Sequence, residues 1–260
     1  MRPLIKQYLG ISAQSIPGLD TDEFGTFSGE IERPFDPITT LRKKIMKGLK
    51  QSGATLGIGS EGSFGPHPRL PFVQADQEVV MMIDLERDFE IFETVISTET
   101  NHARQEIFSL GDLEDFAERI QFTSHAMILK TERDGKVLQV QKGLINWEQL
   151  HAAYQQMAST GEQLVAESDM RAYVNPTRMK VIERATEQLM KKIVNTCPEC
   201  QWPGFGCVET KPGLACRQCG DPTHLTLVRV YHCKSCGYQD ERYVSSSIKA
   251  DPAYCDQCNP

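Results

Sequence analysis

Apolar positions recur with a helical period between residues 36 and 53. Asp36 precedes Pro37, and the apolar residues that follow lie at intervals of three, four, one and three: Ile38, Leu41, Ile45, Met46 and Leu49. This spacing places them on one face of a helix that has an aspartate cap and a proline in its first turn. Gly53 predicts the end of this helix.

Shorter apolar runs predict strands between further helices. We expect strands at residues 54–60, 78–84, 89–97 and 163–167, and a hairpin of 125–130 with 136–141 around Asp134 and Gly135. Asp112 and Asn146 predict the caps of helices that end near residues 120 and 159, and a long helix is expected from Thr177. Alternating strands and helices predict an α/β domain over residues 1–196.

All nine cysteines lie at or after residue 197, which predicts a second domain over residues 197–260. Disulfides do not persist in a reducing compartment, and a CxxC turn presents two thiolates at the separation that tetrahedral Zn²⁺ requires. Cys207 is expected to be a small buried side chain. The other eight form four CxxC pairs, for which we expect two structural zinc ions in a double zinc ribbon: Cys197/Cys200, Cys216/Cys219, Cys233/Cys236 and Cys255/Cys258.

The sequence allows three pairings of these four motifs. The simplest is sequential, with the first two motifs on one zinc and the last two on the other. An interleaved arrangement competes with it. The stretch CRQCG…YHCKSCGY also reads as one complete ribbon, which would leave the outermost motifs to join each other. Gly220 and Gly237 follow two of the motifs and suit the positive φ that such turns often need.

Net charge and hydropathy argue against nucleic acid, anionic lipid and a membrane as partners of this protein. Lys and Arg number 28 and Asp and Glu 35, so the net charge of -7 creates no overall positive field for nucleic acid or anionic lipid. The longest apolar run is Val79 to Ile83, whereas a membrane span takes about 20 residues. Residues 1–10 contain no apolar stretch that would serve as an export signal, so we expect a cytoplasmic protein.

Three polar loops carry groups suited to phosphate and metal chemistry. Residues 21–33 precede the helix that bears Arg42, Lys43 and Lys44, and their polar side chains are Asp22, Glu23, Thr26, Ser28, Glu30 and Glu32. In residues 60–68, Ser60 and Ser63 offer hydroxyls and Glu61 a ligand for a divalent cation. In residues 167–178, the relevant groups are Glu167, Asp169, Arg171 and, at a helix N-terminus suited to phosphate, Thr177 and Arg178. Together they predict a magnesium and polyphosphate site, and solvated surface is the alternative for each loop.

Several long motifs resemble an uncharacterised bacterial domain family with a C-terminal zinc-ribbon region. They are TDEFGTFSGEIERPFDP, GIGSEGSFGPHP, STET, ESDMRAYVNPTRM, CPEC…PGF and ADPAYCDQCNP. The likeness covers nearly the whole chain, but that family has no activity to carry over.

A more distant likeness implies an activity. The order of a helix with TxxRxKK, the strand into GIGSEGSFG, the strand ending in Asp84 and the helix opening with NPTR is similar to the inosine and xanthosine triphosphate pyrophosphatase superfamily. This resemblance implies a mixed central sheet between helices, Mg²⁺ or Mn²⁺ as cofactor, and cleavage of nucleoside triphosphates.

The same resemblance implies residue roles. Glu61 takes the place of the acidic residue that binds metal or activates water, Arg42 and Lys44 would face the phosphates, and Thr177 with Arg178 would form the loop that grips the nucleotide. The polar loops themselves add Asp169 as the second expected catalytic carboxylate and Ser60, Ser63 and Arg171 as expected substrate-binding groups. The first strand and phosphate loop of that superfamily have no counterpart here, because the sequence starts inside the following helix.

Two functions compete. The first is a metal-dependent hydrolase of nucleotides or related phosphorylated small molecules. The second is a non-enzymatic adaptor whose zinc ribbons contact protein or nucleic acid. Residues 197–260 have six basic and seven acidic side chains, and two Cys₄ zinc sites would bring their charge to about -5. That charge disfavours nucleic acid. We expect the tail to stabilise the fold, because zinc binding there would supply folding energy.

Overall fold

The computed structural model describes residues 1–25 and 33–260, apart from the side chain of Asp22. It divides into two compact units, one of residues 1–6 and 11–189 and one of residues 7–10 and 190–260. Thr26, Ser28, Glu30 and Glu32 of the first polar loop lie outside the described residues. Helix α1 (Arg2–Leu9) and the 3₁₀ turn η1 (Asp22–Phe24) come before the first sheet.

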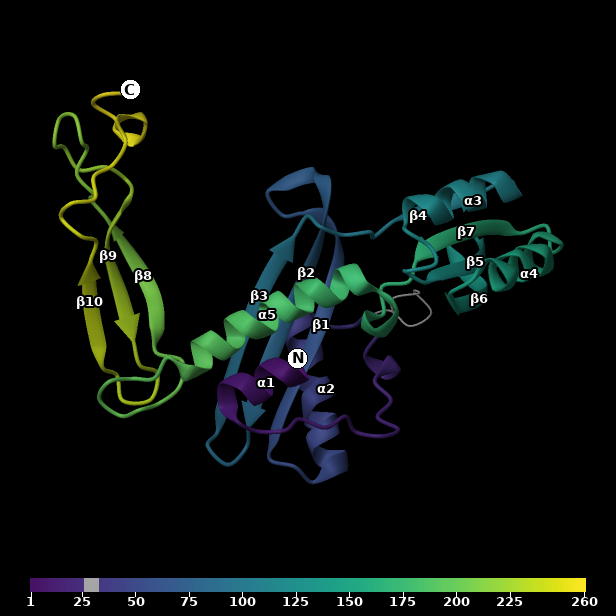
Figure 1. Ribbon diagram of the computed structural model, residues 1–260, viewed down its shortest axis with the longest axis horizontal. Coiled ribbons are helices and arrows are strands. Elements are labelled where there is room, and N and C mark those ends of the chain that lie inside the picture. The colour runs from purple at the N-terminus through teal and green to yellow at the C-terminus, as the bar shows by residue number, and fades with distance from the viewer. Residues whose placement is uncertain (26–32) are drawn as a thin grey trace. The chain divides into compact units, whose positions relative to one another are not determined.

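The first sheet of unit 1 is a three-stranded antiparallel meander, β1 (Leu56–His67), β2 (Leu70–Asp84) and β3 (Phe89–Ser97), with β2 in the centre (Figure 1). Helix α2 (Pro37–Ser52) covers one face. Its predicted boundaries are confirmed, because Asp36 accepts the N–H groups of Ile38 and Thr39 and Gly53 ends the helix at φ 69°. The core between helix and sheet consists of Leu41, Ile45, Leu49, Val79, Met81 and Ile83.

Two glycines bring β1 close to α2. A Cβ atom on Gly57 would lie 2.8 Å from Cγ2 of Ile45, and one on Gly59 would lie 3.0 Å from Cδ1 of Leu41. Because Ile45 branches at Cβ, it has little freedom to move away. These glycines therefore set the distance between the helix and the edge of the sheet.

The opposite face of this sheet meets α5 (Pro176–Val194). Successive residues of a strand point to opposite faces, so Glu78 faces away from the α2 core that Val79 joins. Arg178 of α5 forms an ion pair with Glu78 across this interface. The first sheet is thus enclosed by one helix on each face.

The second sheet of unit 1 has the order β4-β7-β5-β6 and is also antiparallel throughout. Its strands are β4 (Arg104–Ile107), β5 (Met127–Arg133), β6 (Lys136–Leu144) and β7 (Gln163–Ser168). Helices α3 (Leu110–Arg119) and α4 (Trp147–Ala158) pack on one face through Phe116, Leu150 and Met157. The predicted hairpin is confirmed, with Asp134 and Gly135 both at positive φ.

Three expectations need correction. Residues 60–68, expected to form a polar loop, instead continue strand β1 as far as His67, because Ser60 to Pro66 pair with Val80 to Gln74 of β2. The mixed α/β character is confirmed, but the expected mixed central sheet is wrong, because every described strand pair is antiparallel and consecutive strands of the first sheet connect by turns. Asp112 is not the cap of α3. Ser109 is the N-cap, and Asp112 completes a capping box by accepting the N–H of Ser109.

Unit 2 is built on a third antiparallel sheet, β8 (Gly206–Pro212), β9 (Thr226–His232) and β10 (Gln239–Tyr243), with β9 in the centre. Phe205, Tyr231 and Tyr238 pack beside Cys197 and Cys233 in its core. The remaining elements are the 3₁₀ turns η2 (Ala172–Val174) in unit 1 and η3 (Pro252–Tyr254) in unit 2. Within the described parts of the chain, every helix is too short or too polar to cross a membrane.

Replacing Gly57 by alanine should destabilise unit 1, because the added methyl group overlaps Ile45. We expect a loss of about 1–3 kcal/mol in the free energy of unfolding, measured by urea denaturation. Gly111→Ala is the matched control, since a Cβ there meets nothing closer than 3.7 Å. Equal stability of the two variants would contradict the close packing of α2 on β1.

Candidate metal centres and charged site

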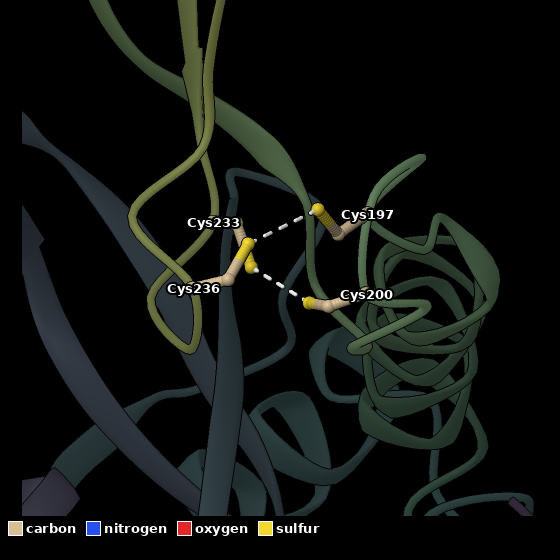
Figure 2. Close-up of side chains that lie close together, drawn as sticks. All are labelled: Cys197, Cys200, Cys233 and Cys236. Atoms are coloured by element: carbon tan, nitrogen blue, oxygen red, sulfur yellow. Dashed lines mark hydrogen bonds between the residues drawn. The ribbon is translucent and has the colours of Figure 1, made fainter.

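The eight paired cysteines form two clusters in unit 2. Cys197, Cys200, Cys233 and Cys236 make the first (Figure 2), and Cys216, Cys219, Cys255 and Cys258 the second. In each cluster all ligand atoms lie within 4.8 Å of one another. The motifs therefore pair first with third and second with fourth. The interleaved alternative is confirmed, and the sequential and nested pairings are wrong.

The strand order explains the interleaving. In an antiparallel meander the ends of successive strands alternate between two edges of the sheet. Gly206 at the start of β8 pairs with His232 at the end of β9, which brings the first and third motifs together. Pro212 at the end of β8 pairs with Thr226 at the start of β9, and the second and fourth motifs meet at that opposite end.

Sulfur separations fit tetrahedral zinc. Sγ atoms of Cys197 and Cys236 lie 3.7 Å apart and those of Cys200 and Cys233 3.6 Å apart. The corresponding distances in the second cluster are 3.9 and 3.5 Å. Zn–S bonds of about 2.3 Å in a tetrahedron give S–S edges of about 3.8 Å, whereas a disulfide measures about 2.05 Å. The clusters thus have the donor set and spacing of structural Cys₄ zinc sites.

Backbone hydrogen bonds preform the metal-binding turns. In each motif the residue after the second cysteine donates its N–H to the carbonyl of the first, over 2.9 Å from Gln201, 3.1 Å from Gly220, 3.0 Å from Gly237 and 2.8 Å from Asn259. Gly220 and Gly237 adopt φ 85° and 76°, as predicted, and Gln201 adopts φ 60° without being glycine. Cys207, expected to be buried, is exposed on β8.

The thiols within each cluster differ in acidity. Hydrogen bonds from the backbone of Cys219 and of Cys236 lower the pKa of Cys216 and of Cys233, respectively, to about 7. The neighbouring Cys219 thiol and burial raise the pKa of Cys258 to about 12. A divalent cation supplies the positive charge that four clustered thiolates need.

A buried carboxylate on β1 is held between two cations. Glu61 is 3% exposed, and its Oε1 lies 2.8 Å from the Arg33 guanidinium and its Oε2 2.7 Å from Nζ of Lys44. Arg33 also donates to Oγ of Ser63 over 2.8 Å and to the carbonyl of Gly62 over 2.7 Å. We call Arg33, Lys44, Glu61 and Ser63 the Glu61 site. Its two cations outnumber its carboxylate, so it carries a net charge of +1.

The Glu61 site adjoins the cavity beside β1. This cavity has a volume of about 940 Å³, and Lys44 and Ser60 are among the residues that line it. Lys44 is 17% exposed and Arg33 24% exposed, so both cations are accessible to a ligand. Arg42 points elsewhere and makes a two-pronged ion pair with Glu90 of β3, with both distances 2.6 Å.

Asp169 and Arg171 form a second charged pair, at the end of β7. Asp169 is fully buried, and its oxygens accept hydrogen bonds from Arg171 and, over 3.1 Å, from the N–H of Gly143. The guanidinium of Arg171 lies 5.1 Å above the ring of Tyr173. The carboxylate of Asp169 is therefore already hydrogen-bonded and ion-paired within the protein.

Arg178 belongs to a third group, under α5. It is 4% exposed and donates to Glu78 over 2.5 Å and to the carbonyl of Met170. Gly62 leaves room for this pair, since a Cβ there would lie 2.6 Å from Oε1 of Glu78.

Asp76 lies two residues before Glu78 and is fully buried, and neither of its oxygens has a hydrogen-bond partner among the described residues. Burial and the charge of Glu78 raise the pKa of Asp76 to about 8.

Side chains already cap the N-terminus of α5. Oδ1 of Asn175 accepts the N–H of Arg178 over 3.0 Å, and Nε2 of His125 accepts the N–H of Thr177 over 3.2 Å. Burial lowers the pKa of His125, which keeps the lone pair that this bond requires. The helix terminus expected to bind phosphate is therefore held by protein groups.

The expected site residues thus divide among four places. Lys44, Ser60, Glu61 and Ser63 lie together, whereas Asp169 with Arg171 and Thr177 with Arg178 have separate partners. Arg42 is paired with Glu90. In the described ranges, only the two cysteine clusters bring three or more metal-ligating side chains together. Glu61 and Asp169 are both ion-paired, so the carboxylates present do not fit a Mg²⁺ or Mn²⁺ site.

Arg33, Asp76 and Glu78 were not among the residues predicted from the sequence. Arg33 ends the polar loop of residues 21–33, for which only other polar side chains were predicted to be functional. Asp76 and Glu78 are two carboxylates on one face of a strand that continues as VVMMI. Acidic residues at alternate positions before such an apolar run are the signal that would have found this buried pair.

Comparison with known proteins identifies a family. A family model described as "Domain of unknown function (DUF6671)" matches residues 44–260. No curated protein and no solved structure matches the chain.

Double substitutions test the zinc pairing. The variant Cys200→Ser/Cys236→Ser alters one interleaved site and should retain one zinc ion per chain, because the second cluster is intact. The variant Cys200→Ser/Cys219→Ser alters both sites and should retain none. Zinc content of the purified variants is measured by atomic emission. The reverse result would support sequential pairing.

Asp76→Asn should change how stability depends on pH. Because burial raises the pKa of Asp76 from 3.8 to about 8, the native state favours the protonated acid, and stability declines as pH rises from about 4 to 8. The loss per pH unit is up to about 1.4 kcal/mol. Asparagine does not titrate, so the variant should be more stable than the parent at pH 8, with a smaller difference at pH 5. The control is Asp115→Asn, at an exposed position of α3. An equal pH dependence in parent and Asp76→Asn would refute a neutral Asp76.

Proposed function

We propose that this chain, which belongs to the DUF6671 family, binds and hydrolyses nucleotides or related phosphorylated small molecules at the Glu61 site. The observation that carries the proposal is the carboxylate of Glu61 between Arg33 and Lys44, next to a cavity that Lys44 and Ser60 line. A cation that lines a cavity, with a second cation on the same carboxylate beside it, suits an anionic group attached to an organic body.

The two cations are suited to phosphate. A guanidinium forms paired hydrogen bonds with phosphate oxygens, and an ammonium supplies a compact positive charge. Glu61 and Ser63 hold Arg33 in place before any ligand arrives. Such preorganisation reduces the entropy that binding costs.

Glu61 is the proposed general base. When phosphate oxygens take over Arg33 and Lys44, the Glu61 carboxylate loses its ion pairs and becomes free to accept a proton from an attacking water molecule. As the water oxygen bonds to phosphorus, the P–O bond to the leaving phosphate or alcohol breaks, and the leaving oxygen takes up a proton from solvent. Arg33 and Lys44 then stabilise the charge that develops on the phosphoryl oxygens. This step uses only residues of the Glu61 site. The other residues expected at the site take no part in this step and keep the protein contacts described above: Arg42, Asp169, Arg171, Thr177 and Arg178.

Adaptor function is the second candidate, and exposed side chains of unit 2 favour it. Val208 of β8 is 59% exposed, and Tyr243 of β10 is 67% exposed. An exposed tyrosine suits contact with another protein, because its ring is apolar and its hydroxyl can form hydrogen bonds. The negative charge of residues 197–260 speaks for a protein partner over nucleic acid. Zinc would stabilise the ribbon in either case.

A panel of phosphorylated compounds tests the hydrolase. Nucleoside triphosphates, nucleoside diphosphates, sugar phosphates and pyrophosphate are incubated with the zinc-loaded protein, with and without Mg²⁺, and released phosphate and pyrophosphate are measured. Glu61→Gln should lower kcat at least about 100-fold, because it removes the base. Lys44→Met should chiefly raise KM, and Lys50→Met on the exposed side of α2 is the control. Absence of release across the panel, or full activity of Glu61→Gln, would disprove the proposal.

A further inference from the structure

The cavity beside β1 is bounded on two sides by apolar groups. Leu41, Ile45 and Leu49 of α2 line it from one face of the first sheet. Ile5 of α1 and Met82 of β2 also line it. Met82 points to the opposite face, since its neighbours Met81 and Ile83 belong to the α2 core. The cavity therefore reaches around the edge of the sheet from one face to the other.

The edge of β1 lines the cavity between these walls. Five consecutive residues, Leu56 to Ser60, contribute to the lining. Their side chains alternate between the two faces, so the feature they share is the main chain. Among the described strands, β1 pairs with β2 alone. Alternate N–H and C=O groups on its outer side are consequently directed into the cavity.

This edge has none of the usual features that prevent a ligand from pairing with it. The segment LGIGS contains no charged residue and no proline, and its two glycines add no side chain. The other edge of the sheet, β3, carries Glu90 and Glu93. Natural proteins commonly protect strand edges with charges, prolines or bulges. The open edge of β1 is thus suited to receive hydrogen-bonding groups.

These features restrict the ligand. It must present apolar faces toward the two walls and hydrogen-bonding atoms along its rim toward the strand edge. An alkyl chain would satisfy the walls but would leave the main-chain groups without partners, at a free-energy cost. A nucleobase is flat, has apolar faces and carries donors and acceptors on its rim. Lys44 and Ser60 then lie at the end of the cavity where the phosphates of such a ligand would meet the Glu61 site.

We infer that this cavity binds the nucleoside part of a nucleotide, with the base paired to the main-chain edge of Leu56–Ser60 and the phosphates at the Glu61 site. The inference rests on the proposed function and narrows its substrates to nucleotides. It also assigns recognition of the base to main-chain groups, so substitutions of side chains within LGIGS would affect it only through cavity shape.

Calorimetry separates the two halves of this site. Affinities are measured for ATP, GTP, CTP and UTP, for the four nucleosides and for inorganic tripolyphosphate. At least one nucleoside triphosphate should bind tenfold or more tightly than tripolyphosphate. Ala13→Trp, which places a large ring in the cavity, should abolish this difference and leave tripolyphosphate affinity within twofold of the parent. Lys44→Met should weaken the binding of all triphosphates.

Two further variants distinguish a filled cavity from a misfolded protein. Ala54→Phe fills the cavity from a second position, and Ala152→Trp places the same indole on the exposed side of α4. Amide resonances of Gly57 and Gly59, followed by ¹⁵N NMR, should shift when the best-binding nucleoside is added and should not shift with tripolyphosphate.

The outcomes distinguish this inference from the proposed function. If phosphate compounds bind and are hydrolysed but no nucleoside moiety adds affinity, the cavity inference fails and the proposed function stands. If the gain survives both Ala13→Trp and Ala54→Phe, the base binds elsewhere and the inference also fails. If nucleosides shift Gly57 and Gly59 but no phosphate compound is hydrolysed, the cavity assignment holds and the hydrolase proposal fails.

Discussion

Buried carboxylates on β1 and β2 need cationic partners, and this requirement organises the first sheet. Taking an unpaired charge out of water costs several kcal/mol, so each buried carboxylate must find a cation or remain protonated. Glu61 meets Arg33 and Lys44 on the α2 face, and Glu78 meets Arg178 on the α5 face. Asp76 has no ion-pair partner among the described residues, and burial together with the charge of Glu78 raises its pKa to about 8.

The ion pair of Glu61 with Lys44 depends on where α2 packs on the first sheet. Lys44 is the cation of α2 that reaches β1, and it lies about one turn after Leu41 and directly before Ile45, two residues of the α2 core. The same helix thus provides one wall of the cavity and the cation at its end. A site of this kind depends on the register between α2 and β1, which the close approach at Gly57 and Gly59 fixes.

Features that depend on residues close together in the sequence could be predicted from the sequence. Asp36, the apolar period and Gly53 defined α2, and the CxxC spacing identified all eight cysteines of the two clusters that could hold metal ions. Two kinds of feature lay beyond such signals. The zinc pairing depends on the meander of β8, β9 and β10, which the motif spacing does not encode. The pair of Glu78 with Arg178 joins residues 100 positions apart, so no local pattern indicates it.

The central claim is that the cations around Glu61 receive a phosphoryl group. A crystal structure of the zinc-loaded protein with a non-hydrolysable nucleoside triphosphate analogue tests it most directly. The account predicts phosphoryl oxygens within about 3 Å of both Nζ of Lys44 and the guanidinium of Arg33, with the Glu61 carboxylate turned toward an ordered water molecule. Analogue bound at another place, with both ion pairs of Glu61 unchanged, would contradict it.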